Sequence, residues 1–214
     1  MMRARTDPPA MPNSATLLLW SSLSLLAAVL LAGVLYGNWV LLQHRLTVIT
    51  PGRVYQSAAM PPDALVQVAK RLGIQTVVDF RAYSEVPADN AEKAALARAG
   101  IAYLRLPSST RPPPETVDTF VRSLQPEVAA GHRLLMHCLD GEGRAVFYSA
   151  IYRIEFEGWD SQRAWLATTR LPPSLMFLGR LFPGIARLSE SNYKTPLIRA
   201  HRRQQPESNH PAGS

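Results

Sequence analysis

A strand, a turn and a helix are predicted around Cys138, the only cysteine in the chain. A short apolar run at 133–136 precedes this cysteine, and an apolar run at 145–154 has the length of a helix. A loop that joins a strand to a helix N-terminus points its backbone N–H groups at a common centre, where the helix dipole adds partial positive charge. The segment therefore predicts a binding site for a phosphate dianion.

The side chains of this turn could act on such a phosphate. The backbone N–H groups and Arg144 would stabilise the thiolate of Cys138, which makes it a nucleophile near neutral pH. Arg144 follows after five intervening residues, so the chain can curl once and the guanidinium can meet two phosphate oxygens. Gly141 and Gly143 permit torsions and a close approach that a Cβ atom would obstruct. The alternative is that the lone cysteine is a small buried hydrophobe.

The pattern His-Cys-x5-Arg, formed by His137, Cys138 and Arg144, resembles the phosphate loop of the cysteine-dependent protein tyrosine phosphatases, and its flanks are similar to their compact dual-specificity branch. Three further stretches resemble the opening strands of small bacterial dual-specificity-like phosphatases, several of which are membrane-tethered: Pro51–Ser57, Gly73–Arg81 and Gly100–Pro107. The similarity covers about residues 47–172.

The resemblance implies a role for each residue of the loop. Cys138 would attack phosphorus and form a phosphocysteine, Arg144 would hold the transferring phosphoryl group, and His137 would orient the loop and favour the thiolate. The implied phosphate-binding residues are His137, Leu139, Gly141, Glu142, Gly143 and Ala145. No metal or organic cofactor is expected, because Arg144 and the backbone N–H groups supply the electrostatic stabilisation.

Two positions depart from the family pattern. Ala145 stands where the family usually has the Ser or Thr that helps the phosphocysteine break down, and no Asp occurs near 108–110, where the family's general acid is expected. The candidate acids, in order of preference, are Asp140, Glu115 and Asp118. Asp140 is preferred because the loop fixes its distance from the phosphate, whereas the alternative is that Asp140 and Glu142 are solvated carboxylates on the rim. General acid catalysis contributes about a hundred- to ten-thousand-fold, so we expect activity at a modest rate.

The charges near the loop restrict the substrate. Asp140 and Glu142 would repel highly anionic ligands, which disfavours multiply phosphorylated inositol lipids. Phosphotyrosine, phosphoserine, phosphothreonine and a lipid with one phosphate monoester all remain. Arg81 follows a predicted central strand at 75–80, where open α/β sheets bind ligands, and could be a second substrate contact. A structural ion pair is the alternative for Arg81.

Residues 15–42 contain no charged side chain and match a membrane-spanning helix in length. Trp20 and Trp39 are separated by a helical rise close to the hydrocarbon thickness of about 30 Å, which predicts anchors at opposite interfaces. A buried core helix and an uncleaved secretory signal are the alternatives. The flanking arginines give no clear orientation: Arg3, Arg5, Arg45 and Arg53. We expect a single-pass protein of the bacterial inner membrane with its catalytic domain outside the cytoplasm.

The chain as a whole predicts one α/β domain with appendages, namely a compact, mainly parallel central sheet with helices on both faces. We expect a disordered tail at 1–14, a transmembrane helix at 15–42, the phosphatase domain at 43–194 and a basic flexible tail at 195–214. The apolar segment 171–182 is expected to pack on the sheet, with a membrane-facing or substrate-lid patch as the alternative. The net charge of +7 comes from scattered basic residues, which disfavours nucleic acid as a partner.

The sequence therefore predicts a membrane-anchored, cysteine-dependent phosphatase acting on phosphate monoesters of proteins. The partners are a phosphorylated protein or phospholipid and, through 15–42, the bilayer. A phosphatidylglycerophosphate-type lipid phosphatase and a catalytically impaired phosphate-binding pseudophosphatase are the alternatives. A sulfurtransferase or arsenate reductase would need a persulfide or a partner thiol, and the chain offers no second cysteine.

Overall fold

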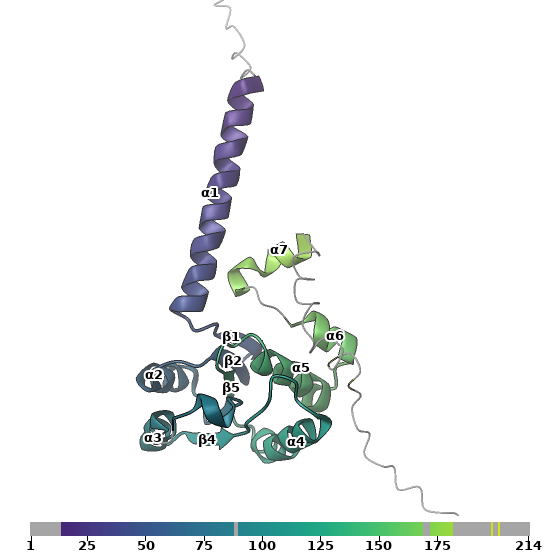
Figure 1. Cartoon of the computed structure of the whole chain (residues 1–214). Coiled ribbons are helices and arrows are strands. Elements are labelled where there is room, and N and C mark those ends of the chain that lie inside the picture. Colours follow the sequence, from purple (N-terminus) through teal and green to yellow (C-terminus); the bar gives the residue numbers. More distant parts are fainter. Residues whose placement is uncertain (1–13, 88–89, 169–171, 182–197, 199–200, 202–214) are drawn as a thin grey trace, which may run out of the picture.

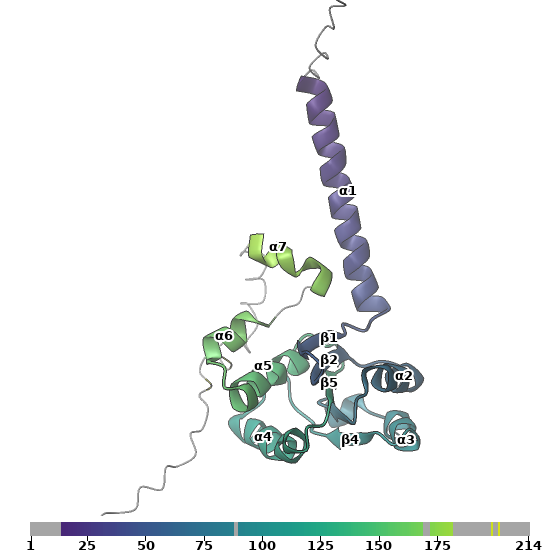
Figure 2. The same ribbon diagram turned by 180° about the vertical axis from the view of Figure 1, so that it is seen from behind.

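The computed structural model describes residues 14–87, 90–168, 172–181, 198 and 201. In these residues a five-stranded sheet carries helices on both faces, and a long helix, α1 (Ser14–Leu41), projects away from it (Figures 1 and 2). The predicted α/β class and mainly parallel sheet are confirmed.

The sheet has the strand order β1-β2-β5-β3-β4. Four strands are parallel to their neighbours, namely β2 (Val54–Ala58), β5 (Leu134–Cys138), β3 (Thr76–Asp79) and β4 (Ala102–Arg105). Strand β1 (Thr47–Thr50) is antiparallel to β2 at the edge. Every residue of β3 and β5 is buried, as expected for parallel strands that are covered on both faces. Cys138 therefore ends the central strand of the sheet.

Two helices cover one face of the sheet and three cover the other. On the first face lie α2 (Pro62–Leu72) and α3 (Ala91–Arg98), and on the second lie α4 (Pro114–Ala129), α5 (Arg144–Glu157) and α6 (Ser161–Leu166). A short 3₁₀ turn, η1 (Tyr83–Glu85), follows β3. On the second face the rings of Phe80 and Tyr148 stack with centroids 4.2 Å apart, which fixes the end of β3 against the first turns of α5.

Helix α1 is joined to the domain through its last turn. The helix is long and apolar enough to span a membrane. Trp20 is 66 % exposed, and its role as an interfacial anchor stays a prediction, whereas Trp39 is only 4 % exposed. The indole N–H of Trp39 donates a hydrogen bond to the carbonyl of Leu46 at 3.1 Å. Trp39 thus differs from its predicted role as an interfacial anchor, because it packs in the joint between α1 and the domain.

The described part of the apolar segment at 171–182, namely residues 172–181, lies on the side of the domain from which α1 projects (Figures 1 and 2). Its described part forms the 3₁₀ turn η2 (Pro173–Leu175), which contacts α1, and helix α7 (Met176–Leu181). Leu175 is buried, whereas Phe177 and Leu181 are exposed. The expected packing on the sheet is therefore not observed in the described residues, because η2 contacts α1 instead and Leu175 belongs to neither of the two core clusters on the sheet.

Of the two predicted tails, the structure describes Ser14, Ile198 and His201. Ile198 is buried in the core that covers the second face of the sheet. His201 Nε2 lies 2.7 Å from Glu155 Oε1 of α5. These two contacts fall within the segment predicted as a flexible tail, so packing against the domain extends as far as residue 201. The other residues of 1–14 and 195–214 lie outside the described part of the chain.

Candidate active site

The loop at 139–143 connects β5 to α5 and has the predicted form of a strand, a glycine turn and a helix. Cys138 is 2 % exposed at the start of the loop. Gly141 has a φ of +67°, and a Cβ atom there would lie 2.6 Å from the backbone nitrogen of Ala58. The Gln56 amide donates to the carbonyl of Gly141 at 3.2 Å. Only glycine fits at position 141, which sets how closely the loop lies against β2.

The N-terminus of α5 points its free backbone N–H groups towards this loop. Gly143 is the N-cap residue, with φ −113° and ψ −83°, and it has no side chain with which to cap the helix. The first N–H groups of a helix have no intrahelical partner and attract anions. The first residue of α5 is Arg144, so the backbone donors and the guanidinium are available to the same ligand.

Arg144 is held in place by four acceptor atoms on three residues. Its Nη1 donates to Glu85 Oε2 at 2.5 Å, and its Nη2 donates to Glu85 Oε1 at 2.8 Å. Nη1 also lies 3.3 Å from the carbonyl oxygens of Phe80 and Ser108. No residue in the described part of the chain accepts a hydrogen bond from Nε. The guanidinium is thus fixed through its two Nη atoms, while the Nε edge is left for an anionic ligand.

The pKa values of this pair follow from the same contacts. Burial alone would lower the pKa of Arg144, but the hydrogen bonds to Glu85 and the negative charges of Cys138, Glu85 and Asp140 raise it overall. Arg144 in turn lowers the pKa of Glu85 below its ordinary value of 4.5, mainly through these hydrogen bonds. Cys138 and Asp140 therefore lie within electrostatic reach of Arg144.

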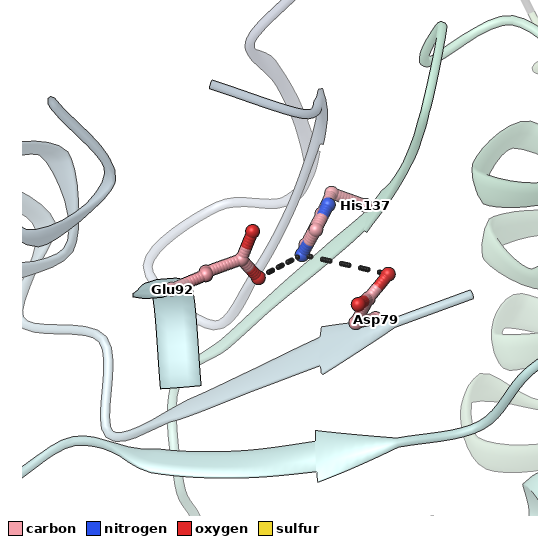
Figure 3. A group of neighbouring side chains, drawn as sticks. All are labelled: Asp79, Glu92 and His137. Atoms are coloured by element: carbon pink, nitrogen blue, oxygen red, sulfur yellow. Dashed lines mark hydrogen bonds and ion pairs between the residues drawn. The ribbon is translucent and has the colours of Figure 1, made fainter. Parts of the chain in front are cut away.

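A buried network of charged side chains surrounds His137, the residue before the nucleophile (Figure 3). His137 Nε2 lies 2.9 Å from Glu92 Oε1 and 3.9 Å from Asp79 Oδ1. Arg81 Nη2 contacts both carboxylates, at 2.9 Å from Asp79 Oδ2 and 2.6 Å from Glu92 Oε2. All four side chains are buried. The network ties the ends of β3 and β5 and the start of α3 together directly beside Cys138.

Asp79 is the most heavily bonded member of this network. It also accepts hydrogen bonds from Tyr103 at 2.6 Å and from Arg105 at 3.1 Å. Burial alone would raise the pKa of Asp79, but the hydrogen bonds from Arg81, the charge of His137 and the other donors lower it below 3.8. Asp79 is therefore ionised at the centre of the network.

This network bears on metal binding and on the predicted substrate contact at Arg81. Ligand atoms of Asp79, Glu92 and His137 lie within 4.8 Å of one another, as in a metal site. Arg81 already places a positive charge on both carboxylates, so a cation would have to displace it. Arg81 is itself 8 % exposed. Arg81 thus forms the structural ion pairs considered above, and its role as a substrate contact stays a prediction.

The candidate acids differ in their surroundings. Asp140 is exposed on the loop beside Cys138, and Glu142 lies 2.5 Å from Arg45 in an ion pair. Glu115 is exposed in the first turn of α4, and Asp118 is half-buried one turn later. Asp140 is thus the candidate that the loop itself places beside the phosphate site. Its role, like those of the other loop residues, stays a prediction.

The sequence interpretation missed two acidic residues that shape the site. Glu85 pairs with Arg144, and its carboxylate also accepts from the backbone N–H of Ala82 at 2.7 Å, which closes the turn after β3. Glu92 pairs with His137, and its only sequence signal is an acidic residue in the first turn of an alanine-rich helix. Ser108, which lies where the family's Asp is expected, also supports the site, because its carbonyl accepts from Arg144 and its hydroxyl from Tyr148.

Comparison with known proteins places this fold and site in a class. The chain matches no family model. Its fold is that of the cysteine-dependent, protein tyrosine phosphatase-like superfamily. The chain is similar to a TpbA variant from Pseudomonas aeruginosa that was crystallised with phosphotyrosine, at a TM-score of 0.52 and 26% identity. That alignment covers 74% of this chain and 85% of the other. PTPMT1 in complex with PI(5)P shares the fold alone, at a TM-score of 0.51 and 16% identity. That alignment covers 72% of this chain and 97% of the other.

The sequence comparison names a particular relative. The chain is homologous to the dual specificity protein phosphatase TpbA of Pseudomonas aeruginosa strain PAO1, with 34% identity over 112 residues, which is 52% of this chain and 47% of the relative. The same protein from strain UCBPP-PA14 matches at 33% over 112 residues. The chain thus spans about half the length of the curated relatives it matches.

Proposed function

We propose that this chain is a membrane-anchored, cysteine-dependent phosphatase that hydrolyses phosphate monoesters on proteins. The observation that carries the proposal is the loop from β5 to α5, in which Cys138 ends the central strand and Arg144 is fixed by Glu85. The homology to a dual specificity phosphatase supports the same reaction class. Helix α1 would be the anchor, with the catalytic domain outside the cytoplasm, and protease accessibility in spheroplasts tests that side.

In the first step the Cys138 thiolate attacks phosphorus. A sulfur–phosphorus bond forms, the bond from phosphorus to the ester oxygen breaks, and the leaving oxygen takes a proton from Asp140. The backbone N–H groups of the loop and the Nε edge of Arg144 hold the non-bridging oxygens. His137, held by Glu92, keeps the end of β5 in position.

In the second step a water molecule attacks the phosphocysteine. Asp140, now a carboxylate, accepts a proton from that water, the sulfur–phosphorus bond breaks, and inorganic phosphate leaves with the thiolate restored. Ala145 offers no hydroxyl to assist, and it is fully buried. We therefore expect the second step to limit the rate, with a burst of leaving group in the first turnover.

Turnover by the full chain in detergent micelles tests this function. We expect hydrolysis of phosphotyrosine, phosphoserine or phosphothreonine peptides by the wild type and none by Cys138→Ser. An aryl phosphate should give a burst close to one leaving group per chain. Tungstate binding without a burst or turnover would instead identify a phosphate-binding pseudophosphatase.

A phospholipid with one phosphate monoester is the second candidate substrate. Strand β1 begins opposite the middle of β2, since Thr47 pairs with Gln56, and the residues before β1 run towards the end of β2, at the edge where the parallel strands end. The carbonyl of His44 accepts from the N–H of Ala58 at 2.7 Å at this same edge. A site so close to a membrane helix favours a substrate in the bilayer. Faster turnover of phosphatidylglycerophosphate in vesicles than of phosphopeptides would support this candidate over the first.

A further inference from the structure

Arg45 forms a contact between the membrane helix and the phosphate-binding loop. It lies in the connection from α1 to β1, and its Nη1 is 2.5 Å from Glu142 Oε1 in the loop. Its guanidinium also lies 5.5 Å from the ring centroid of Trp39 and 6.0 Å from that of Tyr36, both in α1. The Arg45 side chain is 13% exposed, so it is enclosed between the helix and the loop.

The backbone at this point is held in a conformation that side chains rarely adopt. His44 has a φ of 48° and Arg45 a φ of 55°, both in the left-handed region. Such residues persist where surrounding contacts fix them, and they gather at functional positions. The N–H of Ala58 donates to the carbonyl of His44, and the next N–H, of Ala59, donates to the carbonyl of Leu139. The end of β2 thus connects the same junction to the same loop by a second route.

The charge of Glu142 gives this contact a consequence for phosphate. Glu142 belongs to a loop that must bind an anion, and its carboxylate would oppose that binding if it had no partner. We propose that Arg45 is a positioning residue of the phosphate site, an inference that rests on the proposed function. Arg45 neutralises Glu142 and holds the loop to the end of α1, so the affinity for phosphate depends on how the membrane helix meets the domain.

A double-mutant cycle on the full chain in detergent micelles tests this inference, with tungstate affinity measured by calorimetry. We expect Arg45→Met to weaken tungstate binding by about fivefold, the scale of a partly exposed ion pair. In the Glu142→Gln background, Arg45→Met should change the affinity for tungstate by less than about twofold. The negative charge that Arg45→Met leaves without a partner is absent in that background. Arg45→Lys, which keeps the charge, should retain most of the affinity.

A matched control removes one positive charge elsewhere. Arg122 is exposed on α4, and Arg122→Met should leave tungstate affinity unchanged. If Arg45→Met weakened tungstate binding equally in the wild-type and Glu142→Gln backgrounds, the inference would be overturned. Arg45 would then act only through packing of the junction. No weakening in either background would overturn it as well. Wild-type turnover tests the proposed function separately, since tungstate binding is measured without it.

Discussion

The two sides of Cys138 are built in opposite ways. On the side of β3, Asp79, Arg81 and Glu92 are buried and bonded to one another. On the side of the loop, Asp140 is exposed and the backbone of the turn before α5 carries the donors. The charged side chains on the β3 side already have partners. The backbone N–H groups on the loop side are hydrogen-bond donors that can bind a ligand.

This difference separates support from chemistry. A buried, paired charge takes a new ligand only by losing its present partner, which costs several kcal/mol in general. Free N–H groups at a helix N-terminus and the open edge of a fixed guanidinium bind an anion without such a loss. Arg144 joins the two regions, because its Nη atoms are held by Glu85 while its Nε edge is left to the loop.

The largest effect is expected from the residues that carry the chemistry. Arg144→Lys keeps the charge but loses the planar fork, so kcat/KM for an aryl phosphate should fall by about a hundredfold or more. Cys138→Ser should lower it by at least about a thousandfold. Thermal unfolding of Cys138→Ser should stay close to that of the wild type, whereas Arg144→Lys should also lower the unfolding temperature, because it loses hydrogen bonds to Glu85. A small loss of activity in Arg144→Lys would show that the guanidinium does not hold the phosphate bidentately.

The supporting network should respond in stability. Asp79→Asn removes the central charge and leaves Arg81 and Arg105 short of a partner, so the free energy of unfolding should fall by about 3 kcal/mol. Asp63, exposed in the first turn of α2, is the control, and Asp63→Asn should cost less than about 1 kcal/mol. Urea unfolding of the full chain measures both. Similar losses in the two variants would contradict the role given to the network.

The exposed loop acid should respond in rate and not in stability. Asp140→Asn should slow poor leaving groups, such as alkyl phosphates, by about a hundredfold and activated aryl phosphates much less. Glu115→Gln, on an exposed carboxylate of α4, serves as the control. If Asp140→Asn leaves the dependence on leaving group unchanged, the assignment of the acid is wrong.

The smallest effect is expected from Glu85, the partner of Arg144, and it depends on pH. Arg144 lowers the folded-state pKa of Glu85 below 4.5, so the pair stabilises the fold above that pH and loses its effect as the pH falls through the lowered value. Glu85→Gln should cost about 1 kcal/mol at neutral pH, and less as the pH falls below the ordinary pKa of 4.5 and through the lowered value. Chemical unfolding at several pH values measures this. A cost that stays constant with pH would contradict the pairing.

The sequence was sufficient for those features that arise from neighbouring residues. Apolar runs and glycines predicted the strands, the helices and the turn at Gly141, because these depend on local periodicity and torsion. The pairing of Glu85 with Arg144 and of Glu92 with His137 could not be predicted, because each joins residues far apart in the chain. Trp39 met the pattern of a membrane anchor, and only the packing of the junction placed it against the domain.

Rapid acid quenching of the full chain during aryl phosphate turnover, followed by peptide mass spectrometry, tests the central claim most directly. The account predicts one phosphoryl group per chain on the peptide that contains Cys138, and none in Cys138→Ser. Turnover with no phosphoryl group on that peptide, or with the group on another residue, would contradict it.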